Sequence, residues 1–220
     1  QILSLRNHNN KFEALLSNGK NMSADQILCA TGRIPNTNGL GLSAIGVNIG
    51  SKGEVLVNKF NCSNIKNIYA VGDVTNRINL TPVAIAEGQR FADNIFGGQN
   101  IPCDRKNIPS AVFSQPAIGV VGYTEKEAVE KYKRKGGIIV FKTSFSPMKQ
   151  TLSGGKTKIM VKMIVSKHDD RVIGIHAIGD DMPEIIQLAA VAIRAGAKKS
   201  DFDTTMGIHP TAAEEMVTMK

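Results

Sequence analysis

The sequence predicts an α+β fold in which consecutive antiparallel strands are flanked by helices. Residues 138–145, 158–165 and 172–178 are apolar segments with the length and composition of strands. The last two are separated by residues 167–170, whose composition is typical of a hairpin turn. Residues 183–195 are apolar and rich in alanine, begin with proline and stop before glycine, which indicates a helix. Strands in antiparallel succession beside helices are the pattern of the α+β class.

The remaining elements are expected to be shorter. In the first half of the chain, strands are expected at residues 12–16 and 27–30, on either side of a turn, and at residues 54–57 and 68–71. Thr81 is a suitable N-cap and Pro82 a suitable first residue, so a helix is expected to begin there. Thr124 and Glu127 have the spacing of a capping box, which predicts another helix, and a final short helix is expected over residues 211–219.

The composition limits the classes of function. Of the 220 residues, 42% are hydrophobic and 21% are charged, as in ordinary globular proteins. No apolar run reaches about 18 residues, so no membrane partner is expected. The net charge is +8, but the densest basic cluster, at residues 131–135, contains a single aromatic residue. Because nucleic-acid binding requires a basic face and, for single strands, several stacking aromatics, no nucleic-acid partner is expected.

The cysteines indicate a reducing environment. Cys29, Cys62 and Cys103 are dispersed and form neither a CxxC nor a CxxxxC motif. An odd and scattered set argues against a disulfide framework, and its spacing does not match that of a zinc site. Reduced thiols are typical of the cytosol. We therefore expect no metal ion and a cytoplasmic location, or the stroma or matrix of an organelle.

A first candidate site follows the apolar segment 68–71. Gly72 allows a ligand to approach the backbone, and the carboxylate of Asp73 can accept hydrogen bonds from sugar or polyol hydroxyls. The helix expected from Thr81 would present free N–H groups and a partial positive charge to an electron-rich ring. Alternatively, Asp73 caps a turn and Thr81 caps the helix without any ligand. The residues alone leave both interpretations open.

A second candidate site lies near the end of the sequence. Pro210 favours an extended conformation for His209. Glu214 follows Thr211 by three positions, so a capping box explains it without catalysis, and the spacing alone favours this explanation. Alternatively, the Glu214 carboxylate orients the His209 imidazole, fixing its tautomer and raising its basicity for proton transfer.

Several segments occur together and in the same order in a known family. They are ATGRIPN (30–36), YAVGD (69–73), LTPVAIA (80–86), IPSAVFSQPAIGVVG (108–122), FSPM (145–148) and HPTAAEEMVT (209–218). With them, the chain resembles the carboxyl-terminal half of glutathione reductases, which are class I flavoprotein pyridine nucleotide-disulfide oxidoreductases. The first two segments are shared across that superfamily. The last is similar to the glutathione and trypanothione reductase branch, and Ile208 stands where dihydrolipoamide dehydrogenases usually carry histidine.

The resemblance implies three structural parts. Residues 1–36 would end an NAD(P)-binding domain, and residues 37–106 would be the returning segment of an FAD-binding domain, both as partial Rossmann-like α/β segments. Residues 107–220 would form a complete α+β dimerisation domain with an antiparallel sheet and flanking helices. The implied assembly is a homodimer formed through this last part, in which His209 reaches into the active site of the partner subunit.

The resemblance also implies FAD and NADPH as cofactors. The cofactor-binding positions would be Gly32, Arg33, Gly72, Asp73, Asn79, Leu80, Thr81 and His209. Among them, Asp73 would bind the ribityl chain of FAD, Thr81 would face the pyrimidine edge of the flavin, and Asn79 would border the nicotinamide. Gly32 would help to line the NADPH site, and the backbone of His209 would contact FAD.

The implied substrate is glutathione disulfide. By resemblance, His209 would donate and accept the proton of the glutathione thiolate leaving group, and Glu214 would hold its ring. Gln89 stands where the family often has an arginine that meets a substrate carboxylate. Arg90 is the next residue, but neighbours on a helix point about 100° apart, so it does not simply replace that arginine. The expected consequence concerns substrate affinity more than the type of reaction.

The 220 residues contain neither a flavin GxGxxG motif nor a CxxxxC pair. Because a thiolate pair has to pass electrons to the substrate disulfide, the chain is expected to be one part of a longer reductase. The alternatives are a related reductase of the trypanothione or dihydrolipoamide type, or a stand-alone dimerisation or scaffold module without flavin.

We predict that the 220-residue chain, expressed alone, does not reduce glutathione disulfide with NADPH, because it lacks a redox-active cysteine pair. The measurement is NADPH oxidation followed by absorbance, with FAD added and with a complete glutathione reductase as the positive control. Steady turnover by the purified chain would show that this part alone suffices.

Overall fold

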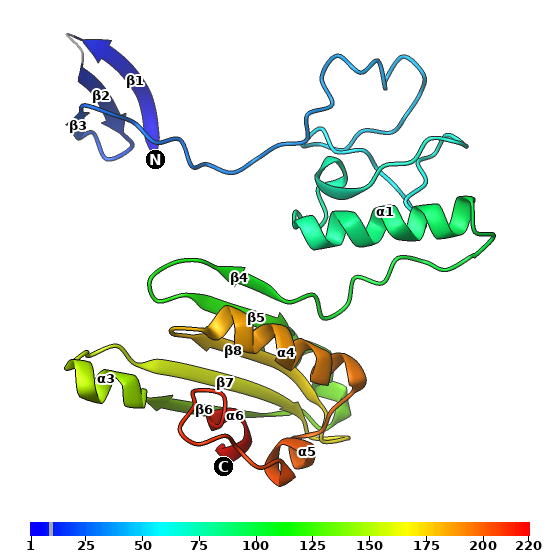
Figure 1. Ribbon diagram of the computed structural model, residues 1–220. Helices are drawn as coiled ribbons and strands as arrows, with labels where there is room; N and C mark the ends of the chain where they lie inside the picture. The colour runs from blue at the N-terminus through cyan, green and yellow to red at the C-terminus, as the bar shows by residue number, and fades with distance from the viewer. Residues whose placement is uncertain (9–10) are drawn as a thin grey trace. The chain divides into compact units, whose positions relative to one another are not determined.

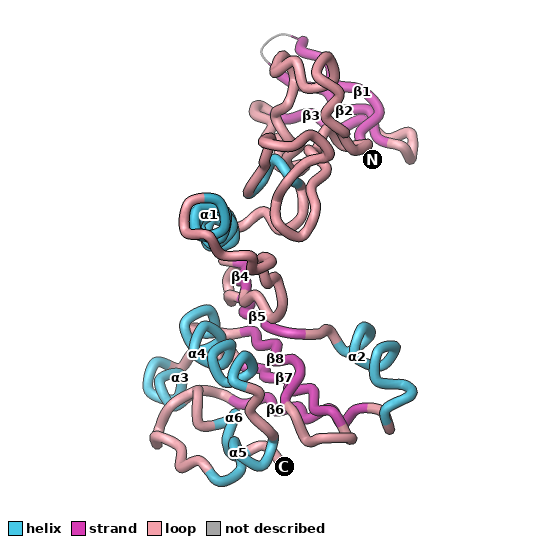
Figure 2. Tube along the Cα trace, turned by 90° about the vertical axis from the view of Figure 1, so that its right-hand side faces the viewer, coloured by secondary structure: helices cyan, strands magenta, loops and turns pink. Residues whose placement is uncertain are grey.

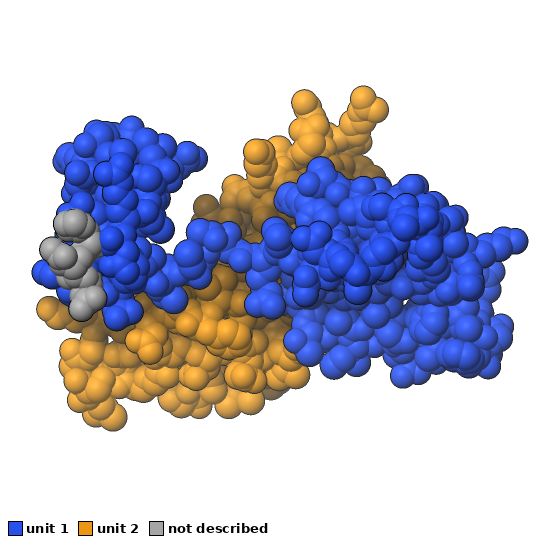
Figure 3. Space-filling view, turned by 90° about the horizontal axis from the view of Figure 1, so that it is seen from above, with its two compact units in different colours: residues 1–103 blue, residues 104–220 orange. Residues whose placement is uncertain are grey.

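Two units make up the chain. The computed structural model describes residues 1–8 and 11–220, and the units are Gln1–Cys103 and Asp104–Lys220 (Figure 3). Antiparallel sheets and helices occur along the chain (Figure 1), so the mixed α/β and α+β class predicted from the sequence is confirmed. None of the helices in the described residues is long and apolar enough to cross a membrane.

The first unit begins with a three-stranded antiparallel sheet. Its strands are β1 (Ile2–His8), β2 (Lys11–Leu16) and β3 (Asn21–Ala24), in that order. The turn after β2 closes with a hydrogen bond of 2.9 Å from the Leu16 N–H to the Lys20 carbonyl, and Asn21 then pairs with Leu15. This tight turn leads directly into β3, so the strand expected at residues 27–30 was wrong and those residues have no regular structure.

The rest of the first unit contains few regular elements. They are the 3₁₀ helix η1 (Gly72–Thr75) and the helix α1 (Thr81–Ile95). The strands expected at residues 54–57 and 68–71 were wrong, because each segment forms only one isolated bridge, Ile49–Val55 and Cys62–Tyr69. Turns beside these bridges prevent a longer ladder, and residues 68–71 are half-buried rather than buried.

The start of α1 differs by one residue from the expectation. Leu80 is the N-cap, and its carbonyl accepts hydrogen bonds from the N–H groups of Val83 and Ala84 at 3.0 and 3.1 Å. Thr81 is therefore the first helical residue and not the cap. Pro82 still lies in the first turn, where its missing N–H leaves no hydrogen bond unmade.

The second unit is built on a five-stranded sheet in the order β4-β5-β8-β7-β6, with every neighbouring pair antiparallel. Its strands are β4 (Ser110–Val112), β5 (Ile118–Gly122), β6 (Ile138–Phe145), β7 (Ile159–Ser166) and β8 (Val172–Ile178). The bounds of β6 and β8 are those predicted, and β7 is shifted by one residue. The predicted hairpin turn joins β7 and β8, and Asp170 adopts a φ of 58° there.

Helices cover both faces of this sheet (Figure 2). One face carries α4 (Met182–Ala195), α5 (Lys199–Thr204) and α6 (Glu215–Thr218), and the other carries α2 (Glu125–Tyr132), which the 3₁₀ helix η2 (Lys133–Lys135) extends. The short helix α3 (Met148–Ser153) follows β6. The main core lies on the α4 face and includes Val121, Ile159, Val161, Met163, Val165, Val172, Ile175, Ala177, Met182, Ile186, Ala189, Ala190, Ile193, Met216 and Met219. Ala128 packs with Ile164 and Ile173 on the opposite face.

The capping box predicted for α2 is confirmed. The Thr124 hydroxyl accepts from the Glu127 N–H at 3.3 Å, and the Glu127 carboxylate accepts from the Thr124 N–H at 2.9 Å. The hydrogen bonds from the Thr124 hydroxyl and N–H hold the pKa of Glu127 below its ordinary value. The helix expected over residues 211–219 is shorter, because the residues after Thr211 form a turn and regular helix starts only at Glu215.

We predict that Ile175→Ala destabilises the second unit by about 2–5 kcal/mol, because it opens a cavity in the middle of the core. Ile175 lies on β8, between β5 and β7, and is fully buried, whereas Ile139 on the edge strand β6 is exposed. Ile139→Ala is the matched control and should change the free energy of unfolding by about 0.5 kcal/mol or less. Chemical denaturation followed by circular dichroism measures both, and equal effects would contradict the assigned core.

Candidate functional site

His209 and Glu214 are in contact. The Nδ1 atom of His209 lies 3.1 and 3.2 Å from the two carboxylate oxygens of Glu214. The same carboxylate accepts from the Thr211 N–H at 3.2 Å, and the Glu214 N–H donates to the Thr211 hydroxyl at 3.3 Å. Glu214, and not Thr211, is the N-cap residue of α6, and its side chain makes no capping hydrogen bond to that helix. A cis peptide bond joins His209 to Pro210. The Glu214 carboxylate therefore contacts both Thr211 and His209, but the reciprocal bonds with Thr211 close a turn and do not cap a helix.

The contact selects a tautomer of His209. An ionised carboxylate can only accept hydrogen bonds, so the nitrogen that faces it carries a proton. The proton therefore sits on Nδ1, and Nε2 is the atom that can accept or release a second proton. The His209 side chain is 77% exposed, whereas that of Glu214 is 18% exposed. A partly buried carboxylate thus orients an accessible imidazole, which is an arrangement suited to acid–base chemistry.

A cavity of about 590 Å³ adjoins this pair. Apart from His209 and Glu214, its lining includes Phe145, Met148, Lys149 and Asp181. The Lys149 ammonium lies 3.1 Å from the Asp181 carboxylate and 3.3 Å from that of Asp180. The hydrogen bond with Asp181 raises the pKa of Lys149, so a cation persists at the wall of the cavity.

Gly72 and Asp73 lie at the start of η1, in the first unit. Gly72 has a φ of +69°, and a Cβ there would lie 2.9 Å from the Cβ of Ala84 on α1. Glycine is therefore required both by the backbone conformation and by the close approach of the helix. The Asp73 side chain is exposed, and so is Thr81 in the first turn of α1. An accessible carboxylate and an accessible helix N-terminus fit a ligand with hydroxyl groups and an electron-rich ring.

Glu87 holds the turn beside Asp73, a role that the sequence did not predict. It is 1% exposed, and its Oε2 atom accepts a hydrogen bond of 2.7 Å from the N–H of Gly72. The bond ties α1 to the 3₁₀ turn that carries Asp73. The signal in the sequence was its spacing: Glu87 lies four residues after Val83, so it shares the buried face of the helix.

The other expected positions are not gathered into one cluster. Gly32 and Arg33 are exposed in a segment without regular structure, and Asn79 is exposed before α1. Leu80 is the half-buried N-cap. The Gln89 amide donates to Asp93 at 2.8 Å, and the Arg90 guanidinium donates to the Gln99 side chain at 3.2 Å and lies 3.6 Å from Asp93. Within residues 1–8 and 11–220, no three His, Cys, Asp or Glu side chains are grouped in a way that could hold a metal ion.

We predict that Glu87→Ala destabilises the first unit by about 1–3 kcal/mol, because it removes the acceptor that the buried N–H of Gly72 uses. Glu87→Gln keeps an acceptor oxygen and should lose less. Ile85→Ala, on the exposed side of the same helix, is the control and should stay within about 0.5 kcal/mol of the original chain. Denaturation curves and exchange of the Gly72 amide hydrogen measure the effect. If Glu87→Ala behaves like Ile85→Ala, Glu87 does not hold this turn.

The fold is shared with a solved flavoprotein. The HOCl-induced flavoprotein disulfide reductase RclA from Escherichia coli matches the whole chain with a TM-score of 0.84 and 24% sequence identity, and the match covers 50% of that protein. At this identity the likeness concerns the fold.

Curated relatives are more similar in sequence. Glutathione reductase from Burkholderia cepacia is 45% identical over 219 residues, which cover 100% of this chain and 48% of the relative. The chloroplastic/mitochondrial glutathione reductase of Pisum sativum is 50% identical over 88% of this chain and 35% of its own length. Trypanothione reductase from Trypanosoma congolense is 44% identical over 92% of this chain and 41% of its own length. The chain therefore spans about half the length, or less, of these relatives.

Two family matches cover most of the chain. Residues 1–88 match the family described as pyridine nucleotide-disulphide oxidoreductase, and residues 108–220 match the dimerisation domain of the same family. The second match alone includes more than half of the sequence, and the chain therefore belongs to the pyridine nucleotide-disulphide oxidoreductases.

Proposed function

We propose that the chain is part of an NADPH-dependent, FAD-containing reductase that converts glutathione disulfide to glutathione. The observation that carries the proposal is the contact between His209 Nδ1 and the Glu214 carboxylate beside a cavity. The identity with two glutathione reductases supports the choice of substrate. In this proposal, residues 1–36 end an NAD(P)-binding domain, residues 37–106 return to an FAD-binding domain, and residues 107–220 form the dimerisation domain.

The residues around η1 fit the proposed flavin. FAD, when bound, supplies the electron transfer from NADPH towards the disulfide. The Asp73 carboxylate is exposed and can accept hydrogen bonds from the ribityl hydroxyls, and Glu87 holds the turn on which it lies. Thr81 and the first turn of α1 provide N–H groups and the positive end of the helix dipole, which favour negative charge nearby. The other proposed cofactor-binding positions are Gly32, Arg33, Gly72, Asn79, Leu80 and the backbone of His209.

His209 handles the proton of the reaction. Reduction of a disulfide consumes two electrons and two protons and releases two thiols. Nε2 of His209 would donate a proton to the departing glutathione thiolate, while Nδ1 keeps its proton against Glu214. The contact with the nearby carboxylate fixes the orientation of the ring. Gln89 is the proposed substrate-binding position on α1, where its amide is exposed and bonded to Asp93.

The proposed active form is a homodimer. The match of residues 108–220 to a dimerisation domain supports this assembly. The 77% exposure of the His209 side chain also supports it, because such an imidazole is accessible to groups from outside its own unit. His209 would then serve the active site of the partner subunit.

A second candidate substrate is trypanothione disulfide, which the 44% identity to a trypanothione reductase supports.

We predict that His209→Ala, in the longer enzyme to which the proposal assigns the chain, slows reduction of glutathione disulfide by about 10²–10⁴-fold, because the thiolate loses its proton donor. Flavin reduction by NADPH should largely persist, since it does not use this proton. Rapid mixing measures the two half-reactions separately. His168→Ala, at an exposed histidine of the β7–β8 turn, is the matched control and should leave both rates unchanged.

Equal slowing of both half-reactions by His209→Ala would rule out this role.

The ratio of kcat/KM for glutathione disulfide to that for trypanothione disulfide decides between the two substrates. A dihydrolipoamide-type enzyme would favour neither, and a scaffold module would have no flavin to reduce.

A further inference from the structure

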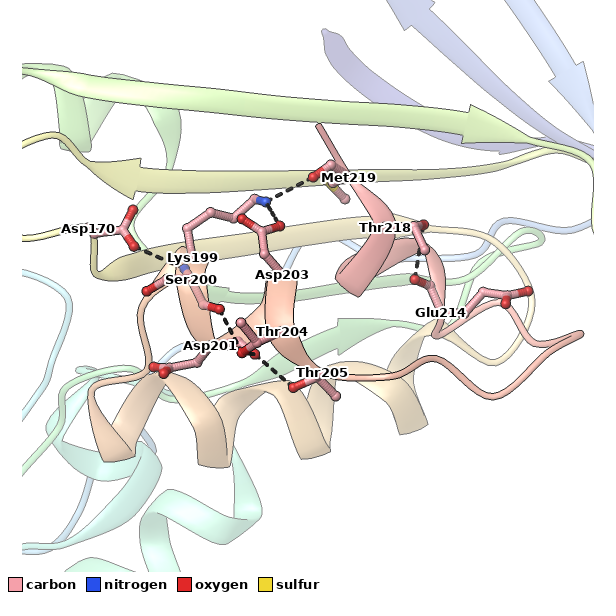
Figure 4. Close-up of polar contacts among 10 residues, drawn as sticks. All are labelled: Asp170, Lys199, Ser200, Asp201, Asp203, Thr204, Thr205, Glu214, Thr218 and Met219. Atoms are coloured by element: carbon pink, nitrogen blue, oxygen red, sulfur yellow. Dashed lines mark hydrogen bonds and ion pairs between the residues drawn. The ribbon is translucent and has the colours of Figure 1, made fainter.

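Lys199 is a lysine buried within the second unit. It lies in the first turn of α5 and is 4% exposed. Its ammonium donates a hydrogen bond of 2.8 Å to the carbonyl oxygen of Met219 and pairs with the carboxylate of Asp203, one turn further along the helix (Figure 4). It also lies 4.5 Å from the centroid of the Phe141 ring on β6. The nitrogen is therefore surrounded by groups that favour a cation.

A buried cation needs such partners, because an unpaired charge in the interior is strongly unfavourable. Asp203 lies on the same helix as Lys199, and Phe141 lies on β6 of the sheet. The Met219 carbonyl is different, since it lies directly after α6, where helix carbonyls lack partners within the helix. The hydrogen bond from Lys199 therefore fixes the end of α6 to the start of α5.

These two ends enclose the segment that carries His209. Lys199 and Met219 are 20 residues apart, and the chain between them runs from α5 through residues 205–214 into α6. The start of α5 is itself fixed, because the N–H groups of Lys199 and Ser200 donate to the carbonyl and side chain of Asp170 at 2.8 and 3.0 Å. Figure 4 shows this anchor at the turn between β7 and β8. Lys199 thus joins the two ends of the segment 199–219, and the first of these ends is anchored on Asp170.

The end of α6 connects directly to Glu214. The carbonyl of Glu214 accepts from the N–H groups of Val217 and Thr218 at 3.0 and 3.1 Å. It also accepts from the Thr218 hydroxyl at 3.1 Å (Figure 4). A helix of four residues is not stable by itself, so its position depends on tertiary contacts. On the other side, a Cβ at Gly207 would lie 2.8 Å from the Cβ of Glu214, so the incoming chain packs closely against this residue. Movement of Met219 would therefore be transmitted to the Glu214 carboxylate.

We propose that Lys199 is a positioning residue for the His209–Glu214 pair. By holding the Met219 carbonyl, it keeps α6 in the place where the Glu214 carboxylate meets Nδ1 of His209. The buried side chains of Met216 and Met219 and the hydrogen bond of 3.3 Å from the Thr143 hydroxyl to Glu215 also hold α6. The segment therefore stays folded without Lys199, but the carboxylate loses its fixed position. The effect of Lys199 on catalysis rests on the proposed function. The structural link, from the Lys199–Met219 contact to the His209–Glu214 pair, does not.

The structural link is tested on the 220-residue chain by ¹⁵N NMR of the His209 ring. In the original chain, Nδ1 should give the signal of a protonated nitrogen bonded to a carboxylate. Lys199→Met removes the donor with little change in length and should move the two ring signals towards those of a free, tautomerically averaged imidazole. Lys198→Met, at the exposed neighbouring lysine, is the control and should leave them in place. Unchanged His209 signals in Lys199→Met would overturn the proposal.

A second variant covers the case in which Lys199→Met does not fold. Asp203→Asn keeps an acceptor for Lys199 but removes the charge that holds its ammonium, at a side chain that is 33% exposed. It should move the His209 signals in the same direction by a smaller amount. If Asp203→Asn leaves these signals at their original positions, Lys199 does not act through its ion pair and the proposal fails.

The catalytic meaning is tested in the longer enzyme. Lys199→Met should lower kcat for glutathione disulfide by about 10–100-fold, as expected for a small misplacement of a catalytic group. Flavin reduction by NADPH and KM should change little. Equal slowing of both half-reactions would overturn the positioning role. If the enzyme does not reduce glutathione disulfide at all while the NMR shifts occur as stated, the proposed function is wrong and the link from Lys199 to His209 stands.

Discussion

The packing of α4 on strands β5 and β8 is the interaction on which the second unit depends. Val121 of β5 and Ile175 of β8 are fully buried in this core, together with Met182 and Ile186 of α4. Because both faces of the sheet are apolar, a helix is needed on each side, and α2 supplies the second. The short helices α5 and α6 attach to the α4 face. The segment with His209 is therefore placed by this core together with hydrogen bonds of its own, among them the one from Lys199 to the Met219 carbonyl.

Local patterns in the sequence predicted part of this unit. The apolar strands β6 and β8 and the capping box at Thr124 were predicted correctly, whereas β4, β5, α3 and α5 were not expected. The apolar segments 27–30 and 68–71 have the same local signal, yet neither forms a strand. A strand exists only where a partner pairs with it over several residues, and partners are set by the tertiary structure. Similarly, only the backbone conformation of Leu80 shows that it, and not Thr81, caps α1.

The candidate site shows a comparable division. The spacing of Thr211 and Glu214 left capping and orientation of His209 as alternatives, but one oxygen can accept more than one hydrogen bond, and Oε1 of Glu214 faces both the Thr211 N–H and His209 Nδ1. Lys199 could not be recognised in the same way, and Glu87 only through its spacing from Val83, because a charged residue in a sequence is normally exposed. In the structure, each holds a backbone group next to a candidate site residue: the Gly72 N–H beside Asp73, and the Met219 carbonyl beyond Glu214.

The contiguity of the His209 segment has a consequence for how the proposed site would be inherited. Lys199, His209, Thr211 and Glu214 all lie on one uninterrupted stretch that ends at Met219, and the sheet contributes mainly a surface to support it. Mutation, recombination or gene fusion can therefore act on the residues proposed to handle the proton as a single block of coding sequence. Such a block can diverge or be replaced without altering the codons for Gly72, Asp73 and Glu87.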